Sequence, residues 1–257
     1  YLKNNNYNFT VVGLPKTVDN DVYPIKQTLG ASTAANQGAV FFNNIVNENT
    51  TSSRQLIIHE VMGRNCGWLT AATAFEYRKI LNKKEFIPEL LIDKHKWDIH
   101  AIYLPEKEIN FDLECNRLNK IMDKHDCVNI FLSEGAGLKA IIAEMKSNNE
   151  EIKYDAFGHI RLDEINPGLW FAKNLKQKLN AHKVLVQKSG YFARSAAPIS
   201  KDIDLIKKTA IFAVKSALKS ISGVVGLDED KNNQMECIEF ERIKGGKPFD
   251  INLDWYK

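Results

Sequence analysis

The segment from Pro15 to Asp21 combines two carboxylates, a lysine and a hydroxyl within a few residues. Asp19 and Asp21 are two positions apart, so in an extended loop their side chains point the same way. Such a pair could share a magnesium ion, or one carboxylate could act as a base while the other tunes the metal. Lys16 would supply a fixed positive charge for phosphate oxygens. An ordinary turn rich in Asn and Asp explains the pattern equally well.

A second candidate site for an anion lies between Met62 and Gly67, where a glycine stands on either side of Arg64. Glycines let the backbone approach a ligand, and the helix expected to begin next offers unpaired N–H groups to an anion. The guanidinium of Arg64 would add a planar fork for phosphate. The alternative is a loop that starts a helix and carries a solvated arginine.

Two further loops carry polar side chains suited to a sugar phosphate. Glu134 lies between a serine and a glycine, where its carboxylate could accept hydrogen bonds from sugar hydroxyls. Tyr191 and Arg194 present a phenol and a guanidinium three positions apart, and together they could hold a phosphate. Glu134 taken alone is no different from an ordinary acidic turn.

Each of these loops follows a predicted buried strand, and apolar residues at helical spacing predict helices between the strands. The alternation indicates parallel sheets covered on both faces, an α/β architecture. Ligands bind at the carboxyl ends of strands in such sheets, so the loops can contribute to one site. We expect strands at 9–13, 56–61, 98–104, 128–132, 183–187, 223–227 and 236–243, and helices at about 32–46, 67–81, 113–124, 167–179 and 202–220.

Composition narrows the class of protein. With 257 residues, 44% of them hydrophobic and 26% charged, the chain is a folded protein of one large or two ordinary domains. The net charge of +3 comes without a basic block, which argues against nucleic-acid binding. Lys215 and Lys219 interrupt the longest apolar stretch, which argues against a membrane span. Four cysteines without a C-x-x-C pair indicate neither a disulfide framework nor a zinc site. We expect a soluble, cytoplasmic protein that binds small anions.

Taken together, these motifs resemble the catalytic part of the 6-phosphofructokinase family, over the region from about Phe9 to near Ser220. The resemblance implies two Rossmann-like lobes with mainly parallel sheets flanked by helices. It implies a donor-side lobe of 1–31 with 160–222 and a sugar-phosphate lobe of 32–159 with 223–257. The segments that carry it are Gly13 to Asp21, Glu60 to Arg64, Ser133 to Gly135, Asp155 to His159 and Gly190 to Arg194.

The resemblance also implies an activity, the transfer of a phosphoryl group to the 1-hydroxyl of fructose 6-phosphate. Asp19 then matches the general base, Thr17 lines the same pocket, and Asp21 lies near a Mg²⁺ ion. His159 matches a histidine near the sugar phosphate in the family, and the alternative is that His159 is a packed, hydrogen-bonded residue without a role in binding. His59 lies inside an apolar run and is expected to be a buried structural residue. The residues that match contacts to the sugar phosphate are Met62, Gly63, Arg64, Glu134, Tyr191 and Arg194.

Lys16 bears on the phosphoryl donor. A lysine directly before Thr17 is similar to the branch of the family that uses pyrophosphate, in which that lysine meets the transferring phosphate. Pyrophosphate offers charge and nothing else to bind, so a cation suits it. Some ATP-using relatives carry the same lysine, which keeps an ATP-dependent kinase as the alternative.

Two other classes of protein compete with an enzyme of this family. A non-catalytic or regulatory chain would be expected to lose the base, yet Asp19, Lys16, Arg64 and Arg194 are all present. A dinucleotide-binding module would carry a G-x-G-x-x-G loop after a strand, and the sequence has none.

The sequence departs from the family pattern in two places. The family's Gly-Gly-Asp loop, which binds the donor phosphates and carries the main metal ligand, is expected before the Lys16 loop, but Gly245 and Gly246 lie near the other end. We therefore expect an incomplete catalytic region that turns over little by itself and acts as a homo-oligomer or with the missing part or a related chain. Gln55, beside Arg54, stands where the family often has a basic residue for the 6-phosphate, so neither residue receives that role.

Overall fold

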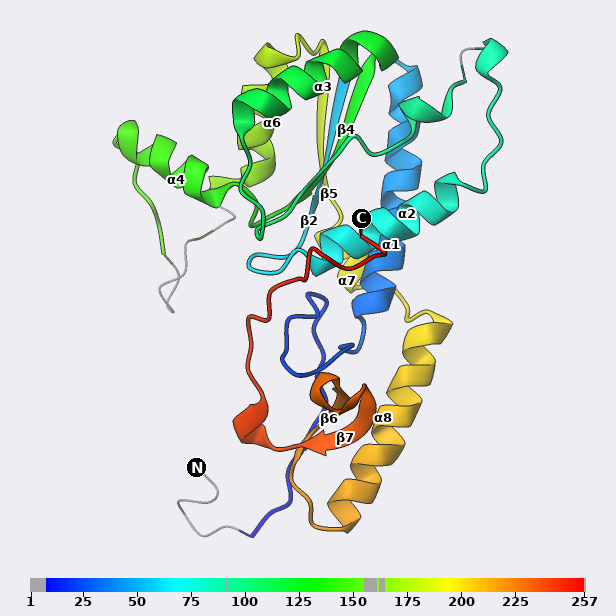
Figure 1. The fold of residues 1–257 in the computed structure, drawn as a ribbon, viewed down its shortest axis with the longest axis vertical. Coiled ribbons are helices and arrows are strands. Elements are labelled where there is room, and N and C mark those ends of the chain that lie inside the picture. The colour runs from blue at the N-terminus through cyan, green and yellow to red at the C-terminus, as the bar shows by residue number, and fades with distance from the viewer. Residues whose placement is uncertain (1–7, 91, 155–160, 162–164, 257) are drawn as a thin grey trace. The chain divides into compact units, whose positions relative to one another are not determined.

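The computed structural model describes residues 8–90, 92–154, 161 and 165–256 (Figure 1). Its strands form a four-stranded sheet in the order β3-β4-β2-β5 and a three-stranded sheet in the order β1-β6-β7. Each sheet belongs to its own unit: the larger unit comprises Ala35–Ser195 and Pro248–Lys257, and the smaller unit comprises Tyr1–Ala34 and Ala196–Lys247.

The larger sheet is parallel throughout. Strand β2 (Gln55–Val61) pairs with β4 (Cys127–Ser133) on one side and with β5 (Lys183–Lys188) on the other, while β3 (Ala101–Tyr103) forms an edge next to β4. Every residue of β2 and β4 is buried. This burial on both faces explains why both strands are mainly apolar in the sequence, although polar residues such as His59 and Asn129 interrupt them.

Helices cover both faces of this sheet. Because side chains alternate along a strand, Leu56 of β2 packs on one face with Leu118 and Phe171, and Ile57 packs on the other with Phe42. The first face lies under α3 (Phe111–His125) and α6 (Pro167–Lys178), and the second under α1 (Ala31–Ile45) and α2 (Trp68–Leu81). The larger unit also contains α4 (Leu138–Ser147) and α7 (Gly190–Arg194).

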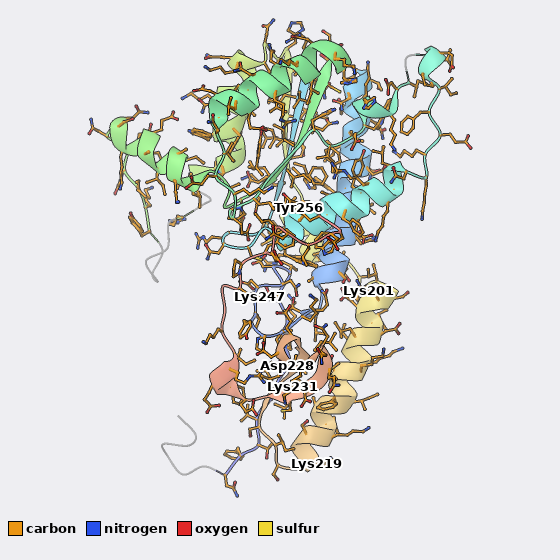
Figure 2. The ribbon with its side chains drawn as sticks, viewed as in Figure 1. Lys201, Lys219, Asp228, Lys231, Lys247 and Tyr256 are labelled. Carbon is orange, nitrogen blue, oxygen red and sulfur yellow. The ribbon has the colours of Figure 1, made fainter. Side chains whose placement is uncertain are left out.

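The smaller unit is built around β6 (Gly223–Asp228), which pairs with the parallel strand β1 (Val12–Gly13) and the antiparallel strand β7 (Gln234–Ile238). Helix α8 (Ser200–Leu218) contacts all three strands. Two predicted strands of this unit, 9–13 and 236–243, are shorter than expected, as is the strand predicted at 98–104 in the larger unit. Strand β7 ends before a 3₁₀ turn at Phe240–Arg242, and Arg242 forms a bidentate pair with buried Asp228, which is labelled in Figure 2 (2.8 and 3.0 Å).

The division into units differs from the lobes expected from the sequence. The segment 160–195 belongs with the larger unit, because β5 pairs with β2 from Gln55↔Lys183 to Glu60↔Lys188. The segment 223–247 belongs with the smaller unit, because β6 pairs with β1 at Val12↔Gly223. Across the described part of the chain, no helix is both long and apolar enough to cross a membrane.

Candidate functional site

A pocket of about 320 Å³ opens in the larger unit at the carboxyl ends of β2, β4 and β5. Four residues predicted from the sequence line it: Met62, Glu134, Tyr191 and Arg194. Parallel strands end at the same edge of a sheet, so loops far apart in the sequence converge here. The pocket is therefore a candidate site for the sugar phosphate.

The loops that follow β2 and β4 hold each other in place. The N–H of Gly63, which has a φ of 132°, donates to the Glu134 carboxylate at 3.2 Å, and the Ser133 hydroxyl donates to the Gly63 carbonyl at 2.6 Å. A Cβ on Gly135 would lie 1.7 Å from the Arg64 carbonyl oxygen, so only glycine allows this approach. These contacts fix the Glu134 carboxylate at the pocket, whereas the side chain of Arg64 is not among the groups that line it.

Helix α7 presents its two predicted polar residues to solvent. Tyr191 is 86% exposed, and the Arg194 guanidinium carbon lies 6.0 Å from the centre of the tyrosine ring. A phenol and a guanidinium side by side at the rim of a pocket provide hydrogen-bond donors and a positive charge for an anion.

The start of α7 is attached to β2 by a buried hydrogen bond. His59 Nε2 lies 2.8 Å from the hydroxyl of Ser189, the residue directly before α7, and the imidazole packs among Phe41, Phe42 and Phe131. Complete burial lowers the pKa of His59 to about 3, so the ring is neutral near pH 7. The sequence-based prediction that His59 is buried structure is confirmed.

This buried histidine predicts a pH dependence of stability. Its pKa falls from 6.5 in the exposed state to about 3 in the fold, so the unfolded chain binds the extra proton between those values and stability decreases as the pH is lowered through 6.5. Lowering the pH from 7 to 5 should cost about 2 kcal/mol of unfolding free energy from this residue. Urea unfolding at both pH values should show that His59→Gln no longer loses this free energy between pH 7 and pH 5. The control His182→Gln, at an exposed histidine, should lose as much as the wild type. An unaltered pH dependence in His59→Gln would contradict the assignment.

In the smaller unit, buried Asn20 shapes the loop that carries Asp19. Asn20 has a φ of 56°, accepts a hydrogen bond from the Thr28 N–H at 2.8 Å and donates to the Lys26 carbonyl at 3.2 Å. The Thr28 hydroxyl donates to the Thr17 carbonyl at 2.7 Å, and the Asp19 N–H donates to the Thr17 hydroxyl at 3.2 Å. The loop is thus a fixed turn that holds Asp19 half-buried next to Thr17.

Lys16 and Asp21 flank Asp19 in this loop, and each keeps at least part of its surface open to solvent. Lys16 is exposed, and its backbone pairs with Leu29 in an isolated parallel bridge. Asp21 is half-buried, and its carbonyl accepts a hydrogen bond from the Lys247 N–H at 2.8 Å. The side chains of Lys16 and Asp21 are therefore accessible to ligands.

Replacing Asn20 by alanine should destabilise the loop. The change removes the acceptor for the buried Thr28 N–H and the donor to Lys26, which should cost about 1 to 3 kcal/mol of unfolding free energy. Denaturant unfolding of Asn20→Ala and Asn20→Gly checks this. The glycine variant keeps the left-handed backbone and should still lose most of that free energy; if it is as stable as the wild type, the side-chain bonds do not hold the loop.

Two other sequence candidates are not among the residues that line the pocket in the described part of the chain. One of them, His159, lies with the matched segment around it outside the described residues. Arg54 lies at the amino end of β2 and donates to Asp123 at 2.7 Å and to the carbonyls of Leu179 and Asn180 at 2.6 and 2.9 Å, so it joins elements of the fold at the end of the strand opposite the pocket.

The described residues do not build a metal centre by themselves. Among residues 8–90, 92–154, 161 and 165–256, no group of three or more His, Cys, Asp or Glu side chains is placed to hold a metal ion. Asp21 offers a single carboxylate. Mg²⁺ commonly takes one or two protein carboxylates together with substrate phosphates and water, so this chain would supply at most part of its coordination.

Sequence reasoning missed two charged residues of the pocket, Glu60 and Lys188. Glu60 lies inside the matched segment, but because it belongs to a strand expected to be buried, it was not considered as a pocket residue. Lys188 directly follows the predicted strand 183–187 and precedes Ser189 and Gly190. This position after a strand could have indicated that Lys188 lies at the binding site.

Comparison with known proteins places the chain in a family. Residues 1–217 match the family described as Phosphofructokinase. The chain belongs to the phosphofructokinase family. The α/β phosphofructokinase fold predicted from the sequence is thereby confirmed. A solved structure of a pyrophosphate-dependent phosphofructokinase from Marinobacter aquaeolei also shares the fold, with a TM-score of 0.65 at 22% identity over 99% of this chain and 58% of that one.

Among curated phosphofructokinase relatives, the pyrophosphate–fructose 6-phosphate 1-phosphotransferases of Methylomonas methanica and Mastigamoeba balamuthi are 57% and 50% identical over 256 residues, which is 100% of this chain. The predicted resemblance to the pyrophosphate-using branch is confirmed by these values. An ATP-dependent 6-phosphofructokinase of Persephonella marina is 26% identical over 98% of the chain and 65% of its own length. The chain spans 63% and 62% of the length of the first two relatives.

Proposed function

We propose that this phosphofructokinase transfers a phosphoryl group from pyrophosphate to the 1-hydroxyl of fructose 6-phosphate, giving fructose 1,6-bisphosphate and inorganic phosphate in glycolysis. The observation that carries the proposal is the convergence of Met62, Glu134, Tyr191 and Arg194 on one pocket. The names of relatives at 50–57% identity support the same reaction.

In the proposed reaction, Asp19 of the smaller unit takes the proton of the 1-hydroxyl as the sugar oxygen attacks the near phosphorus of pyrophosphate. The bridging P–O bond breaks, and inorganic phosphate leaves with the bonding electrons. Lys16 neutralises charge on the transferring phosphoryl group, and Thr17 lies next to the base. Such transfer depends mainly on positioning and charge neutralisation, so one base, a bound Mg²⁺ ion and the surrounding cations would be enough to support it.

The larger unit binds the sugar phosphate in this proposal. Tyr191 and Arg194 hold the 6-phosphate, and Glu134 accepts hydrogen bonds from sugar hydroxyls. Met62, Gly63 and Arg64 complete the contacts from the loop after β2. The smaller unit is then the donor side and the larger unit the sugar-phosphate side of an incomplete phosphofructokinase region.

Mg²⁺ is part of the same proposal. When bound, it neutralises phosphate oxygens of the donor, and Asp21 would contribute one carboxylate oxygen to it. We also propose cytoplasmic action, since the free thiols of Cys66, Cys115, Cys127 and Cys237 suit a reducing compartment. Assembly as a homo-oligomer, or with the remaining part of the enzyme or a related chain, is proposed on the resemblance to the family.

Assays with alternative donors on the full-length protein test the proposed function. Fructose 1,6-bisphosphate formation is measured with Mg²⁺, fructose 6-phosphate and either pyrophosphate or ATP. We expect turnover with pyrophosphate and at least about 100-fold less with ATP, because the four relatives at 50–57% identity are all named as pyrophosphate users and Lys16 offers a charge where pyrophosphate has nothing else to bind. Preference for ATP would support the ATP-dependent alternative, and failure with both donors would support a non-catalytic chain.

A further inference from the structure

Glu60 and Lys188 form an ion pair inside the pocket. The two residues are direct partners in the parallel register of β2 and β5, so their side chains leave the same face of the sheet. Lys188 Nζ lies 2.8 Å from a Glu60 carboxylate oxygen and 2.9 Å from the Asn166 side-chain oxygen. The Glu60 side chain is 7% exposed and that of Lys188 is 46% exposed, so the ammonium is the member of the pair that a ligand can reach.

The carboxylate of Glu60 is fixed from its other side by a helix. Its second oxygen accepts a hydrogen bond at 2.8 Å from the N–H of Gly168, which lies in the first turn of α6. N–H groups in the first turn lack partners inside the helix and favour a negative charge. A Cβ on Gly168 would lie 2.4 Å from Glu60 Oε2 and 2.8 Å from Val186 Cγ1, so glycine is needed for this approach.

These contacts position the ammonium of Lys188. An ammonium group has three N–H donors, and the bonds to Glu60 and Asn166 use two of them. The third donor belongs to a side chain that lines the same pocket as Arg194. The pocket is also lined by the carboxylates of Glu60 and Glu134, which repel a phosphate dianion. Two cations, Lys188 and Arg194, therefore favour phosphate binding there more than Arg194 alone would.

We propose that Lys188 is a further substrate-binding residue, whose third N–H donates to a phosphate oxygen of fructose 6-phosphate. Glu60 and Gly168 are positioning residues that hold the ammonium toward the pocket. This assignment rests on the proposed function, because it names a contact within the sugar-phosphate site.

Steady-state kinetics of Lys188→Met in the full-length protein test the contact. Loss of one charge-assisted hydrogen bond should raise KM for fructose 6-phosphate by about 10- to 100-fold and leave kcat within about threefold. Lys183→Met is the matched control, since Lys183 lies at the other end of β5 and pairs with Glu48 at 2.8 Å. We expect its KM to stay within about twofold of the wild type.

A double variant separates substrate binding from mere neutralisation of Glu60. In Glu60→Gln/Lys188→Met no carboxylate remains without its cation, so the variant should fold even if Lys188→Met does not. A KM that stays at least about tenfold above the wild type supports the contact. Return of KM to the wild-type value overturns it, as does a Lys188→Met variant that behaves like Lys183→Met.

The positioning role has its own variant. Gly168→Ala displaces the Glu60 carboxylate and should raise KM by about threefold to tenfold with little change in kcat. An unaltered KM would overturn the positioning part. Wild-type protein that neither binds nor converts fructose 6-phosphate would overturn the proposed function together with this assignment, whereas an active wild type with an unaffected Lys188→Met overturns the assignment alone.

Discussion

Asp19→Ala should lower kcat for fructose 1,6-bisphosphate formation by about 10² to 10⁴ and leave KM for fructose 6-phosphate within about threefold. The proposed role of the carboxylate is to accept the proton of the attacking hydroxyl, an interaction that strengthens only in the transition state. Binding of the sugar phosphate is assigned to the pocket of the larger unit, which the substitution does not alter. Initial-rate kinetics with saturating pyrophosphate and Mg²⁺ measure both constants.

Asp19→Asn is the matched variant for this prediction. Asparagine keeps the size of the side chain and leaves the Thr17 hydroxyl as acceptor for the backbone N–H of residue 19, but it does not accept a proton near neutral pH. We expect its loss in kcat to equal that of the alanine variant within about tenfold. A kcat within tenfold of the wild type in both variants would mean that Asp19 is not the base.

Lys16→Met should lower kcat/KM for pyrophosphate by about 10² to 10³, the range seen when one preorganised donor to transition-state charge is removed. Lys16 is exposed, and the neighbouring bond from the Leu29 N–H to the Pro15 carbonyl, at 2.9 Å, is made by the backbone alone. The free energy of unfolding should therefore change by less than about 0.5 kcal/mol. Kinetics with varied pyrophosphate and denaturant unfolding give the two values.

Lys26→Met controls for the general loss of a positive charge in the smaller unit. Lys26 is also exposed, and its 3.7 Å pair with Glu229 is of the surface kind that contributes little. We expect pyrophosphate kinetics within about twofold of the wild type for this variant. If Lys16→Met behaves in the same way, the assignment of pyrophosphate as donor loses its support from this loop.

The strands that position the pocket could be predicted from the sequence because buried strands are rich in apolar residues. Strands β2 and β4 are covered on both faces and are mainly apolar in the sequence, and each is followed by a glycine-containing loop. Since parallel strands end at one edge, the convergence of Met62, Glu134 and Tyr191 could also be anticipated.

What the sequence could not provide was the pairing between distant strands. Apolar periodicity shows that 183–187 forms a strand but not that its neighbour is β2, and the bounds of the compact units therefore differ from those of the expected lobes. Because the pairing of β2 with β5 was not known from the sequence, the ion pair of Glu60 and Lys188 could not be predicted. These two residues are 128 positions apart and meet only through the register of the two strands.

A crystal structure of the full-length protein with bound fructose 6-phosphate would give the distance between the Asp19 carboxylate and the sugar 1-hydroxyl that this carboxylate is proposed to deprotonate. We expect a distance of about 2.6 to 3.2 Å, directly or through one water, with the 6-phosphate on Tyr191 and Arg194. A 1-hydroxyl more than about 6 Å from Asp19, or a phosphate bound away from that pair, would contradict it.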